Sequence, residues 1–452
     1  MISATGLLEL IGKTPLVRVS CFDTAGSELW LKLESNNPGG SIKDRIGLSM
    51  IAAAEQAGLL KPGGHIIEAT AGNTGLGLAL VSALRGYRLT LVVPDKMSQE
   101  KVTHLKALGA EVIWTRSDVG KGHPAYYQDM AQRIAGETGA FYVNQFENPA
   151  NPAAHEQTTA PEIWEQTGHQ LDAIVAGVGS GGTITGMSRY FGKVAPDVEI
   201  VLADPKGSVL AGYVETGKVG EAGSWLVEGI GEDFIPPICD LSRVKRAYTI
   251  DDAEAFATVR TLLAKEGILA GTSSGVLVAA AARYCRDRKT PGKVVTFVCD
   301  SGAKYLSKAY RDEWLADQGL LPHATYGDLR DVVARRAGQL VDVSPDDALR
   351  VAYARMRLHD VSQLPVLDRG ALVGILDESD LLVAALAGDH AFGKSVRDVM
   401  STKVETLAPN ASIADLVAVL DRGLVGVVVD RGALFGIVTR IDLVNYLRRR
   451  IA

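Results

Sequence analysis

The sequence predicts an α/β fold for roughly its first 315 residues, followed by a smaller region of a different kind. Short apolar runs rich in valine and isoleucine alternate with helical stretches through the first part. This alternation is typical of parallel sheets that helices cover on both faces. The remaining residues contain one pattern twice. A length of 452 residues agrees with one large domain and a duplicated small module.

The predicted strands of the first part are near-continuous apolar runs, each followed by a turn or a helical stretch. Pro94 ends one of them, and a helix rich in leucine and alanine is expected at 75–84, after another. In chain order, we expect strands at 66–70, 89–94, 111–114, 172–176, 198–203 and 294–298. Because such strands are apolar on both sides, the helices between them must cover both faces of the sheet.

The second part is a duplication. The run at 368–372 recurs at 430–434, 62 positions later, and Asp380 recurs as Asp442 at the same spacing. A repeat this long indicates a duplicated module rather than an array of short solenoid units. We therefore expect a first domain at 1–316, a linker at 317–327, and two copies of the module at 328–384 and 395–452.

The composition excludes several classes of function. The chain has 53 acidic and 47 basic residues and a net charge of −6, which argues against a nucleic-acid partner. Its four cysteines are widely spaced and form no C-x-x-C pair, so neither a disulfide framework nor a metal site is expected. The start of the chain has no basic segment before an apolar one, and no run of about 18 apolar residues occurs. We therefore expect a cytoplasmic protein with no membrane partner.

Three stretches of the first part carry residues that suit chemistry. Lys43 directly follows a Pro-Gly-Gly turn, at the start of an apolar helical stretch. A lysine can form a Schiff base when desolvation, or the positive end of a nearby helix, lowers the pKa of its amine. A lone lysine near a turn, however, is usually exposed to solvent and has no such role. The stretch 70–75 lies between a strand and a helix. Its glycines, with Asn73 and Thr74, suit either an anion at the helix N-terminus or an ordinary capped turn.

The stretch 177–183 is the best candidate for a phosphate site. It lies between a strand and a helix and contains four glycines and two hydroxyl side chains. It lacks the Gly-Lys-Ser/Thr end of a Walker loop and the spacing of a dinucleotide fingerprint, so one phosphate is favoured over ATP or a dinucleotide. A purely structural loop is the alternative. Together, a nucleophilic lysine, a phosphate loop and an α/β core suggest pyridoxal phosphate.

With these motifs the chain resembles the pyridoxal-phosphate enzymes of β-replacement, in the cysteine synthase superfamily. Within them it resembles the cystathionine β-synthase family of the haem-free bacterial type, with a C-terminal pair of CBS domains. The run at 227–231, Val-Glu-Gly-Ile-Gly, is similar to that of these synthases rather than to that of the cysteine synthases. The resemblance covers nearly the whole chain. It implies a fold type II pyridoxal-phosphate domain followed by a tandem CBS (Bateman) module.

The resemblance also implies roles for individual residues. Lys43 would hold the cofactor and, once released, would move the Cα proton of the substrate. Asn73 would bond the 3′ oxygen of the cofactor, and Ser273 would face the pyridine nitrogen and keep the ring neutral. The phosphate would be held by Gly179, Ser180, Gly181, Gly182 and Thr183. The substrate would be held by Thr70, Ala71, Asn73, Thr74, Gln145 and Gly229.

Three departures from the family pattern stand out. Ala71 occupies a position where the family often has serine. Glu232 follows Gly231, where the better-known synthases have tyrosine, which leaves the homocysteine contacts and the assistance to the leaving group open. No Cys-Pro with a downstream histidine leads the chain, so we expect no haem, and no haem ligand in Cys21.

The reaction that the resemblance implies is the condensation of L-serine with L-homocysteine to L-cystathionine and water, with release of hydrogen sulfide from cysteine as a second reaction. One alternative is an O-acetylserine-dependent cystathionine or cysteine synthase, and another is a non-catalytic sensor of adenosyl ligands. In the CBS pair, Thr439 and Asp442 fit a group that binds the ribose of S-adenosylmethionine or an adenine nucleotide. Asp377 replaces that threonine in the first repeat, so a simple helix cap is favoured for Asp380. A homodimer or higher homo-oligomer is also expected.

Overall fold

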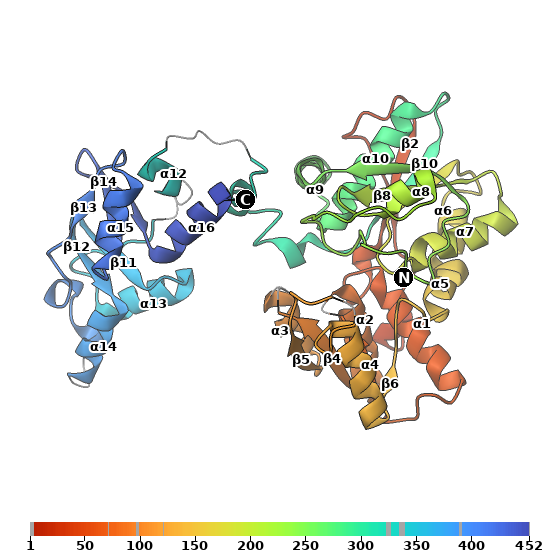
Figure 1. Ribbon diagram of the computed structural model, residues 1–452, viewed down its shortest axis with the longest axis horizontal. Helices are drawn as coiled ribbons and strands as arrows, with labels where there is room; N and C mark the ends of the chain where they lie inside the picture. Colours follow the sequence, from red (N-terminus) through yellow and green to blue (C-terminus); the bar gives the residue numbers. More distant parts are fainter. Residues whose placement is uncertain are drawn as a thin grey trace. The chain divides into compact units, whose positions relative to one another are not determined.

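The computed structural model describes residues 4–70, 72–95, 99–120, 122–321, 327–333, 340–387 and 391–451. The chain divides into two compact units, 1–311 and 312–452, and each is described by itself (Figure 1). No helix in the described part of the chain is long and apolar enough to cross a membrane.

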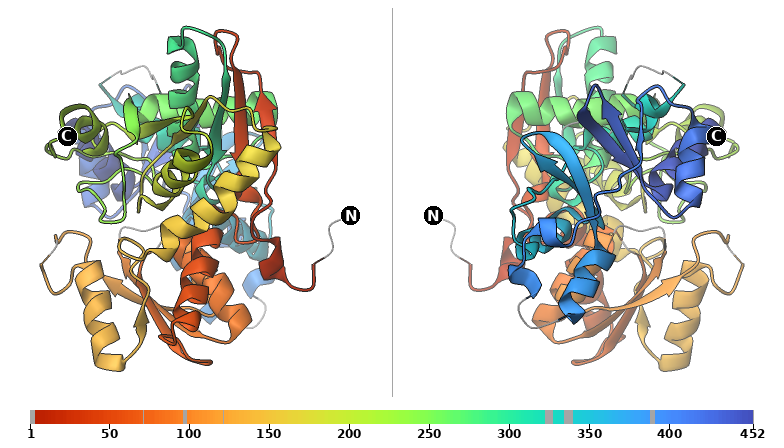
Figure 2. Two further views of the ribbon diagram at one scale, coloured as in Figure 1. Left: turned by 90° about the vertical axis from the view of Figure 1, so that its right-hand side faces the viewer. Right: turned by 90° about the vertical axis from the view of Figure 1, so that its left-hand side faces the viewer.

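The first unit contains a six-stranded and a four-stranded sheet (Figure 2). The larger sheet has the order β1 (Leu16–Val19), β2 (Glu28–Leu33), β10 (Lys293–Val298), β7 (Ala173–Ala176), β8 (Glu199–Pro205), β9 (Val244–Ile250). Only the pair β1–β2 is antiparallel. The smaller sheet is wholly parallel, in the order β5 (Glu111–Thr115), β4 (Arg88–Pro94), β3 (His65–Ala69), β6 (Phe141–Tyr142). All six predicted strands are confirmed, and β1, β2, β6 and β9 are additional.

The helices of the first unit connect and cover these strands. They are α1 (Lys43–Gln56), α2 (Asn73–Arg85), α3 (Gln99–Ala107), α4 (Tyr127–Thr138), α5 (Ala150–Ala154), α6 (Ala160–Gln166), α7 (Gly182–Val194), α8 (Leu210–Thr216), α9 (Asp252–Glu266) and α10 (Thr272–Asp287). A π-helical turn, η3 (His155–Thr159), joins α5 to α6. Short 3-10 turns are η1 (Leu7–Leu10), η2 (Glu34–Asn36) and η4 (Gly302–Tyr305).

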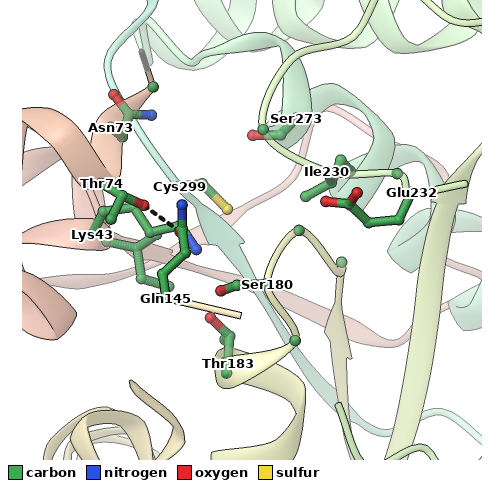
Figure 3. Close-up of a pocket in the computed structure, with 18 of the residues that line it drawn as sticks. Lys43, Asn73, Thr74, Gln145, Ser180, Thr183, Ile230, Glu232, Ser273 and Cys299 are labelled. Atoms are coloured by element: carbon green, nitrogen blue, oxygen red, sulfur yellow. Dashed lines mark hydrogen bonds between the residues drawn. The ribbon is translucent and has the colours of Figure 1, made fainter. Parts of the chain in front are cut away.

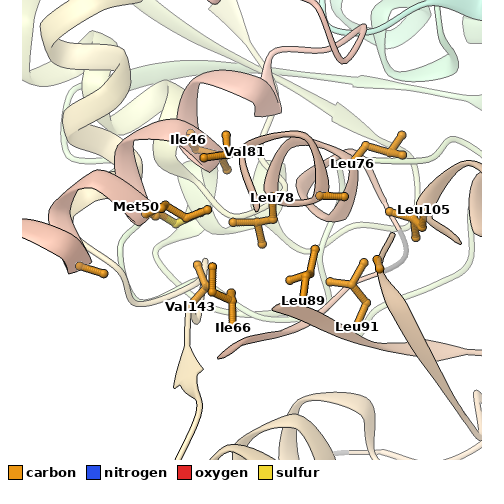
Figure 4. Close-up of a cluster of buried hydrophobic side chains, with 14 of the residues drawn as sticks. Ile46, Met50, Ile66, Leu76, Leu78, Val81, Leu89, Leu91, Leu105 and Val143 are labelled. Carbon is orange, nitrogen blue, oxygen red and sulfur yellow. The ribbon is translucent and has the colours of Figure 1, made fainter. Parts of the chain in front are cut away.

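The smaller sheet is covered on both faces, as its apolar strands predict. Ile66 of β3 packs in a core with α1 and α2, whereas the next residue, Ile67, packs against α4. Leu91 and Val92 of β4 divide between the same two cores. Figure 4 shows the first core, which α1 and α2 close from one side. This double cover holds the N-termini of α1 and α2 next to each other, where Lys43 and Asn73 lie.

The second unit contains one five-stranded sheet, in the order β11 (Gln363–Asp368), β12 (Ala371–Asp377), β15 (Ala433–Val438), β14 (Gly426–Asp430), β13 (Thr406–Leu407). Its helices are α11 (Asp312–Asp317), α12 (Leu329–Val333), α13 (Leu349–His359), α14 (Glu378–Leu386), α15 (Ile413–Asp421) and α16 (Arg440–Ile451), with 3-10 turns η5 (Ala391–Gly393) and η6 (Val396–Asp398). The two repeats therefore share one sheet, in which β12 pairs with β15.

The two repeats exchange their first segments. Leu329 and Val333 of α12 are buried in the core of the second repeat, and Val396 of η6 is buried in the core of the first. The backbone N–H of Arg330 donates to the carbonyl of Pro409 over 3.1 Å, and that of Arg397 donates to the carbonyl of Pro345 over 2.9 Å. Because each core needs a segment of the other repeat, the pair forms one folding unit.

Candidate active site

One cavity of the first unit brings the predicted site residues together. Its volume is about 260 Å³, and it lies at the carboxyl ends of β3, β7 and β10, where open α/β sheets bind ligands. The residues predicted for the cofactor and the substrate that line it are Lys43, Thr70, Asn73, Thr74, Gln145, Gly179, Ser180, Gly181, Gly182, Thr183, Gly229 and Ser273. Figure 3 shows most of these side chains around one space. Ala71, the remaining candidate, lies outside the described residues.

Lys43 is the first residue of α1, and its side chain lines the cavity. Burial lowers the pKa of its ammonium group, although Cys299 and Glu232 act in the opposite direction. A lowered pKa increases the neutral fraction of the amine, which is the form that attacks a carbonyl carbon.

Arg45, two residues after Lys43, anchors the start of α1. Its guanidinium group is almost fully buried and makes two 2.8 Å hydrogen bonds to Glu34. It also donates to the two carboxylate oxygens of Glu162 over 2.8 and 2.7 Å. The same carboxylate accepts from the buried Lys32 of β2 over 2.8 Å. This network fixes the end of the helix from which Lys43 reaches the cavity.

The loop after β7 has the backbone of an anion cradle. Gly181 has a φ of +88°, which favours glycine, and it is the N-cap of α7. No side chain caps α7, so the N–H groups of its first turn remain available to a ligand. A Cβ atom at Gly182 would lie only 1.9 Å from Oδ1 of Asn151. The glycine at 182 is thus required by the packing of the protein itself.

Two buried side chains hold the hydroxyl groups of this loop. Nδ2 of Asn151 donates to Oγ of Ser180 over 2.9 Å, which leaves the hydroxyl hydrogen of Ser180 for a ligand. Nε2 of His155 lies 3.2 Å from Oγ1 of Thr183, and its Nδ1 lies 2.9 Å from the Thr159 hydroxyl. Burial lowers the pKa of His155 well below its ordinary value, so its ring is neutral. The sequence analysis missed both side chains.

Asn73 is held in one orientation by groups from η4 and from Asp300, the second residue after β10. Its Nδ2 donates to Oδ2 of Asp300 over 2.7 Å, and its Oδ1 accepts from Nζ of Lys304 over 2.8 Å. The hydroxyl of Tyr305 donates to the same oxygen of Asp300 over 2.7 Å. Asp300, Lys304 and Tyr305 were not predicted. They follow Asn73 by more than two hundred residues and form no recognisable motif with it.

Two of the residues expected to hold a substrate, Thr74 and Gln145, contact each other in the wall of the cavity. Oγ1 of Thr74 donates to Oε1 of Gln145 over 2.7 Å, which leaves the amide hydrogens of Gln145 for a carboxylate (Figure 3). Oγ1 of Thr70 accepts from the N–H of Gly72 over 3.1 Å. A larger cleft of about 670 Å³ shares Thr70, Gln145 and Glu232 with the cavity. The cavity and the cleft therefore adjoin each other.

Ser273 and Cys299 complete the wall of the cavity opposite the phosphate loop (Figure 3). Ser273 is the second residue of α10 and is buried. Burial raises the pKa of the Cys299 thiol to about 12, so it stays a neutral thiol next to Lys43. An uncharged hydroxyl at 273 cannot protonate a pyridine nitrogen as a carboxylic acid would.

These residues fit pyridoxal phosphate. The uncapped helix and the glycine loop suit its phosphate, and Lys43 suits its aldehyde. Asn73 and Ser273 supply neutral polar groups for the ring oxygen and the ring nitrogen. Among the described residues, no group of three or more histidine, cysteine, aspartate or glutamate side chains is placed to hold a metal ion.

The second unit has a smaller cavity of about 180 Å³ between its repeats. It is lined by Thr439 from one repeat and by residues such as Asp360 and Ser362 from the other. The N–H and hydroxyl of Thr439 donate to Oδ2 of Asp442 over 2.8 and 2.5 Å. In the first repeat, Asp377 and Asp380 form a capping box at the start of α14.

Comparisons with known proteins agree with this geometry. The pyridoxal-phosphate dependent enzyme family matches residues 7–300, and the CBS domain family matches residues 329–387 and 396–449. The chain is 36% identical to the cystathionine β-synthase of Oryctolagus cuniculus, over 98% of this chain and 85% of that one. It is 35% identical to the cystathionine β-synthase of Dictyostelium discoideum, over 98% and 92% of the two chains.

Solved structures of enzymes agree with the fold. An O-ureido-L-serine synthase has a TM-score of 0.64 and 34% identity, over 70% of this chain and all of that one. A hydrogen sulfide-producing enzyme from Fusobacterium nucleatum has a TM-score of 0.61 and 36% identity, over 67% of this chain and all of that one. The predicted fold type II domain and CBS pair are thereby confirmed. The chain belongs to the pyridoxal-phosphate-dependent enzymes and, within them, to the cystathionine β-synthase family that carries a C-terminal CBS pair.

Proposed function

We propose that this chain condenses L-serine with L-homocysteine to form L-cystathionine and water. The observation that carries the proposal is the single cavity that joins Lys43, the uncapped phosphate loop and the substrate-side group of Thr74 and Gln145. The relatives that match along nearly the whole chain are cystathionine β-synthases, which supports this reaction over the O-acetylserine alternative. Lys43, a half-buried lysine with a lowered pKa that lines an open cavity, argues against a non-catalytic sensor.

Each group of the cavity has a distinct task in this proposal. Pyridoxal phosphate, when bound, supplies the electron sink that weakens the bonds at Cα and Cβ of serine. The amine of Lys43 holds the cofactor and then accepts the Cα proton. The phosphate lies on residues 179–183 at the N-terminus of α7.

Neutral groups set the orientation of the cofactor and the substrate. The amide of Asn73, held by Asp300 and Lys304, bonds the ring oxygen of the cofactor. The hydroxyl of Ser273 faces the ring nitrogen. The substrate carboxylate is held by Thr70, Asn73, Thr74, Gln145 and Gly229.

The same site supports release of hydrogen sulfide from cysteine. In that reaction the thiol of cysteine leaves in place of the hydroxyl of serine, so no new group is needed in the cavity. The solved structure from Fusobacterium nucleatum, which is similar over 67% of this chain, is that of a hydrogen sulfide-producing enzyme.

We also propose that the CBS pair modulates or assembles the enzyme rather than catalyses. The proposed division is a catalytic domain at 1–316, a linker at 317–327 and CBS domains at 328–384 and 395–452. An adenosyl compound would bind in the cavity beside Thr439, with its ribose on Asp442.

A homo-oligomer is supported by exposed apolar side chains at equivalent positions of the two repeats, Leu382 on α14 and Val444 on α16, which are 61% and 56% exposed. The absence of haem stays a prediction.

A comparison of two donors tests the proposed reaction. The purified protein, loaded with pyridoxal phosphate, is given homocysteine with either serine or O-acetylserine, and kcat/KM is measured for cystathionine formation with each donor. We expect serine to be converted at a rate typical of enzymes, with kcat of about 1–10³ s⁻¹. Turnover of O-acetylserine alone would contradict serine as the donor, and turnover of neither would contradict a β-replacement enzyme.

A further inference from the structure

Glu232 lies where the inner cavity opens into the larger cleft. It lines both spaces, whereas Lys43 lines only the inner one. Figure 3 shows its carboxyl group across the cavity from Lys43, on the far side of the space that a substrate would occupy. A group in this place can meet both the side chain of the first substrate and a second substrate that enters through the cleft.

The backbone of Glu232 is fixed on both sides. Its N–H donates to Oγ of Ser208 over 3.1 Å, and its carbonyl accepts from that hydroxyl over 3.1 Å and from the N–H of Val209 over 3.0 Å. Gly231 donates its N–H to the carbonyl of Val178, next to the phosphate loop, over 2.8 Å. A Cβ atom at Gly231 would lie 2.5 Å from Pro205. The position of Glu232 relative to the cavity is therefore set by close packing.

The carboxyl group of Glu232, by contrast, is not engaged by the protein. Within the described ranges of the chain it makes no hydrogen bond and no ion pair. Most enclosed carboxyl groups have such partners, because an unpaired one loses the favourable contacts it had with water. An enclosed but unpartnered acid that faces a substrate cavity is placed to exchange a proton with the ligand.

The surroundings of Glu232 favour its protonated form near neutral pH. Burial raises the pKa of Glu232 to about 8, with Asp233 and Asp204 adding to the effect and Lys43 opposing it. The further titratable groups that face it are Cys239, Tyr126 and Tyr127, whose pKa values are all raised above their ordinary ranges. These three groups are neutral at physiological pH and compete little for the proton.

The proposed reaction moves protons at two sites besides Cα. The β-hydroxyl of serine leaves readily only as water, which requires a proton at its oxygen as the Cβ–O bond breaks. The thiol of homocysteine must lose a proton as the S–Cβ bond forms. Lys43 can serve these sites only by passing on the proton that it took from Cα, whereas Glu232 lies across the cavity, where the cleft opens into it. Ser180 and Thr183 lie on the phosphate loop, and Cys299 has a raised pKa.

We propose that Glu232 is the general acid for the departing hydroxyl of serine and the general base for the incoming thiol. Its carboxylic acid gives a proton to the β-oxygen as the Cβ–O bond breaks, and water leaves. The resulting carboxylate takes the proton of the thiol as the S–Cβ bond forms. Glu232 thus returns to its starting form, and no oxidant or further reactant is needed. This inference rests on the proposed function.

The test compares two donors that differ only in their need for a proton. β-Chloroalanine loses chloride, which needs no proton, whereas the hydroxyl of serine must be protonated and leaves as water. The rate of the first half-reaction, without thiol, is followed by the visible absorbance of the cofactor in the wild type and in Glu232→Gln, which keeps the size of the side chain. We expect the variant to react about 10²- to 10⁴-fold more slowly with serine and close to the wild-type rate with β-chloroalanine.

Two further readouts separate a proton carrier from a structural role. In the wild type, the serine half-reaction should slow as the pH rises through about 8, the pKa of Glu232, and this limb should vanish in the variant. The infrared band of a protonated carboxyl group should titrate over the same range in cofactor-free protein and be absent from Glu232→Gln. Glu215→Gln, which removes an exposed carboxylate of α8 that lines neither the cavity nor the cleft, is the matched control and should react with serine at close to the wild-type rate.

The outcomes are distinct. Equal slowing of both donors, or slowing of neither, would overturn the role of Glu232 and leave the proposed function standing. A wild-type protein that consumes β-chloroalanine but not serine would overturn the proposed function and this inference together.

Discussion

Replacement of Gly182 by alanine should damage both stability and cofactor binding through one side chain, Asn151. The new methyl carbon would lie 1.9 Å from Oδ1 of Asn151, so the amide must move. Asn151 is fully buried, and its Nδ2 bonds the carbonyl of Gln145 over 2.8 Å and the hydroxyl of Ser180 over 2.9 Å. Each lost bond costs about 1 kcal/mol, and a buried group left without a partner costs about 1–3 kcal/mol.

The expected destabilisation of Gly182→Ala is therefore about 2–5 kcal/mol, a drop of about 3–8 °C in the melting temperature of the first unit of the cofactor-free protein. Displacement of Ser180 should also remove one hydrogen bond to the charged phosphate of the cofactor. The loss of binding free energy is about 1.5–3 kcal/mol, which makes the Kd for pyridoxal phosphate about 10- to 100-fold weaker.

Thermal melts and titrations of cofactor absorbance measure the two effects. Gly212→Ala in α8 is the matched control, because a Cβ atom there meets nothing within 4 Å. Melting and cofactor affinity of Gly182→Ala equal to those of the control would refute this account of the loop.

Three further results are expected. Burial alone would raise the pKa of Glu162, but Arg45 and Lys32 lower it to about 2. The ionised carboxylate therefore stabilises the folded protein above about pH 4.5. This contribution, about 3 kcal/mol, is lost as the pH falls towards 2. The melting temperature of the wild type should therefore fall more steeply over that range than that of Glu162→Gln, and parallel curves would contradict the assignment. A chain that ends near Gly319 should stay folded and active, as circular dichroism and cystathionine formation would show, and loss of activity would make the CBS pair essential to catalysis. If an adenosyl compound binds, a hundredfold excess over Kd should stabilise the full-length chain by about 2.7 kcal/mol. Asp442→Ala should abolish this stabilisation in a thermal melt. If no adenosyl compound raises the melting temperature of the wild type, the ligand proposal is wrong.

The strands that sequence reasoning found are those whose residues are apolar on both faces. β3, β4 and β8 are such runs, and helices cover both of their sides. β2 and β9 were missed because charged residues interrupt them. Lys32 of β2 is fully buried, and the carboxylate that compensates its charge belongs to Glu162, 130 residues away in the sequence. No local pattern could have shown that pairing.

The candidate site divides in the same way. Lys43, Asn73 and the glycines at 179–182 lie in short motifs beside strand ends, so the sequence was enough to select them. The residues that hold them, such as Asp300 behind Asn73 and Asn151 behind Ser180, come from distant segments and carry no motif of their own. The sequence marked Glu232 only as a departure from the family pattern. Its enclosed and unpartnered carboxyl group became evident only in the fold.

Product analysis with serine and homocysteine tests the central claim most directly. The wild type and Lys43→Ala, both supplied with pyridoxal phosphate, are incubated with the two amino acids, and cystathionine and residual serine are measured by mass spectrometry. The wild type should form one cystathionine for each serine consumed. The variant should lose the visible absorbance of the lysine-bound cofactor and fall in turnover by orders of magnitude, because the anchor of the cofactor and the carrier of the Cα proton are lost together. Formation of cystathionine by Lys43→Ala at close to the wild-type rate would contradict the assignment of this lysine, and the absence of cystathionine from both reactions would contradict the proposed function.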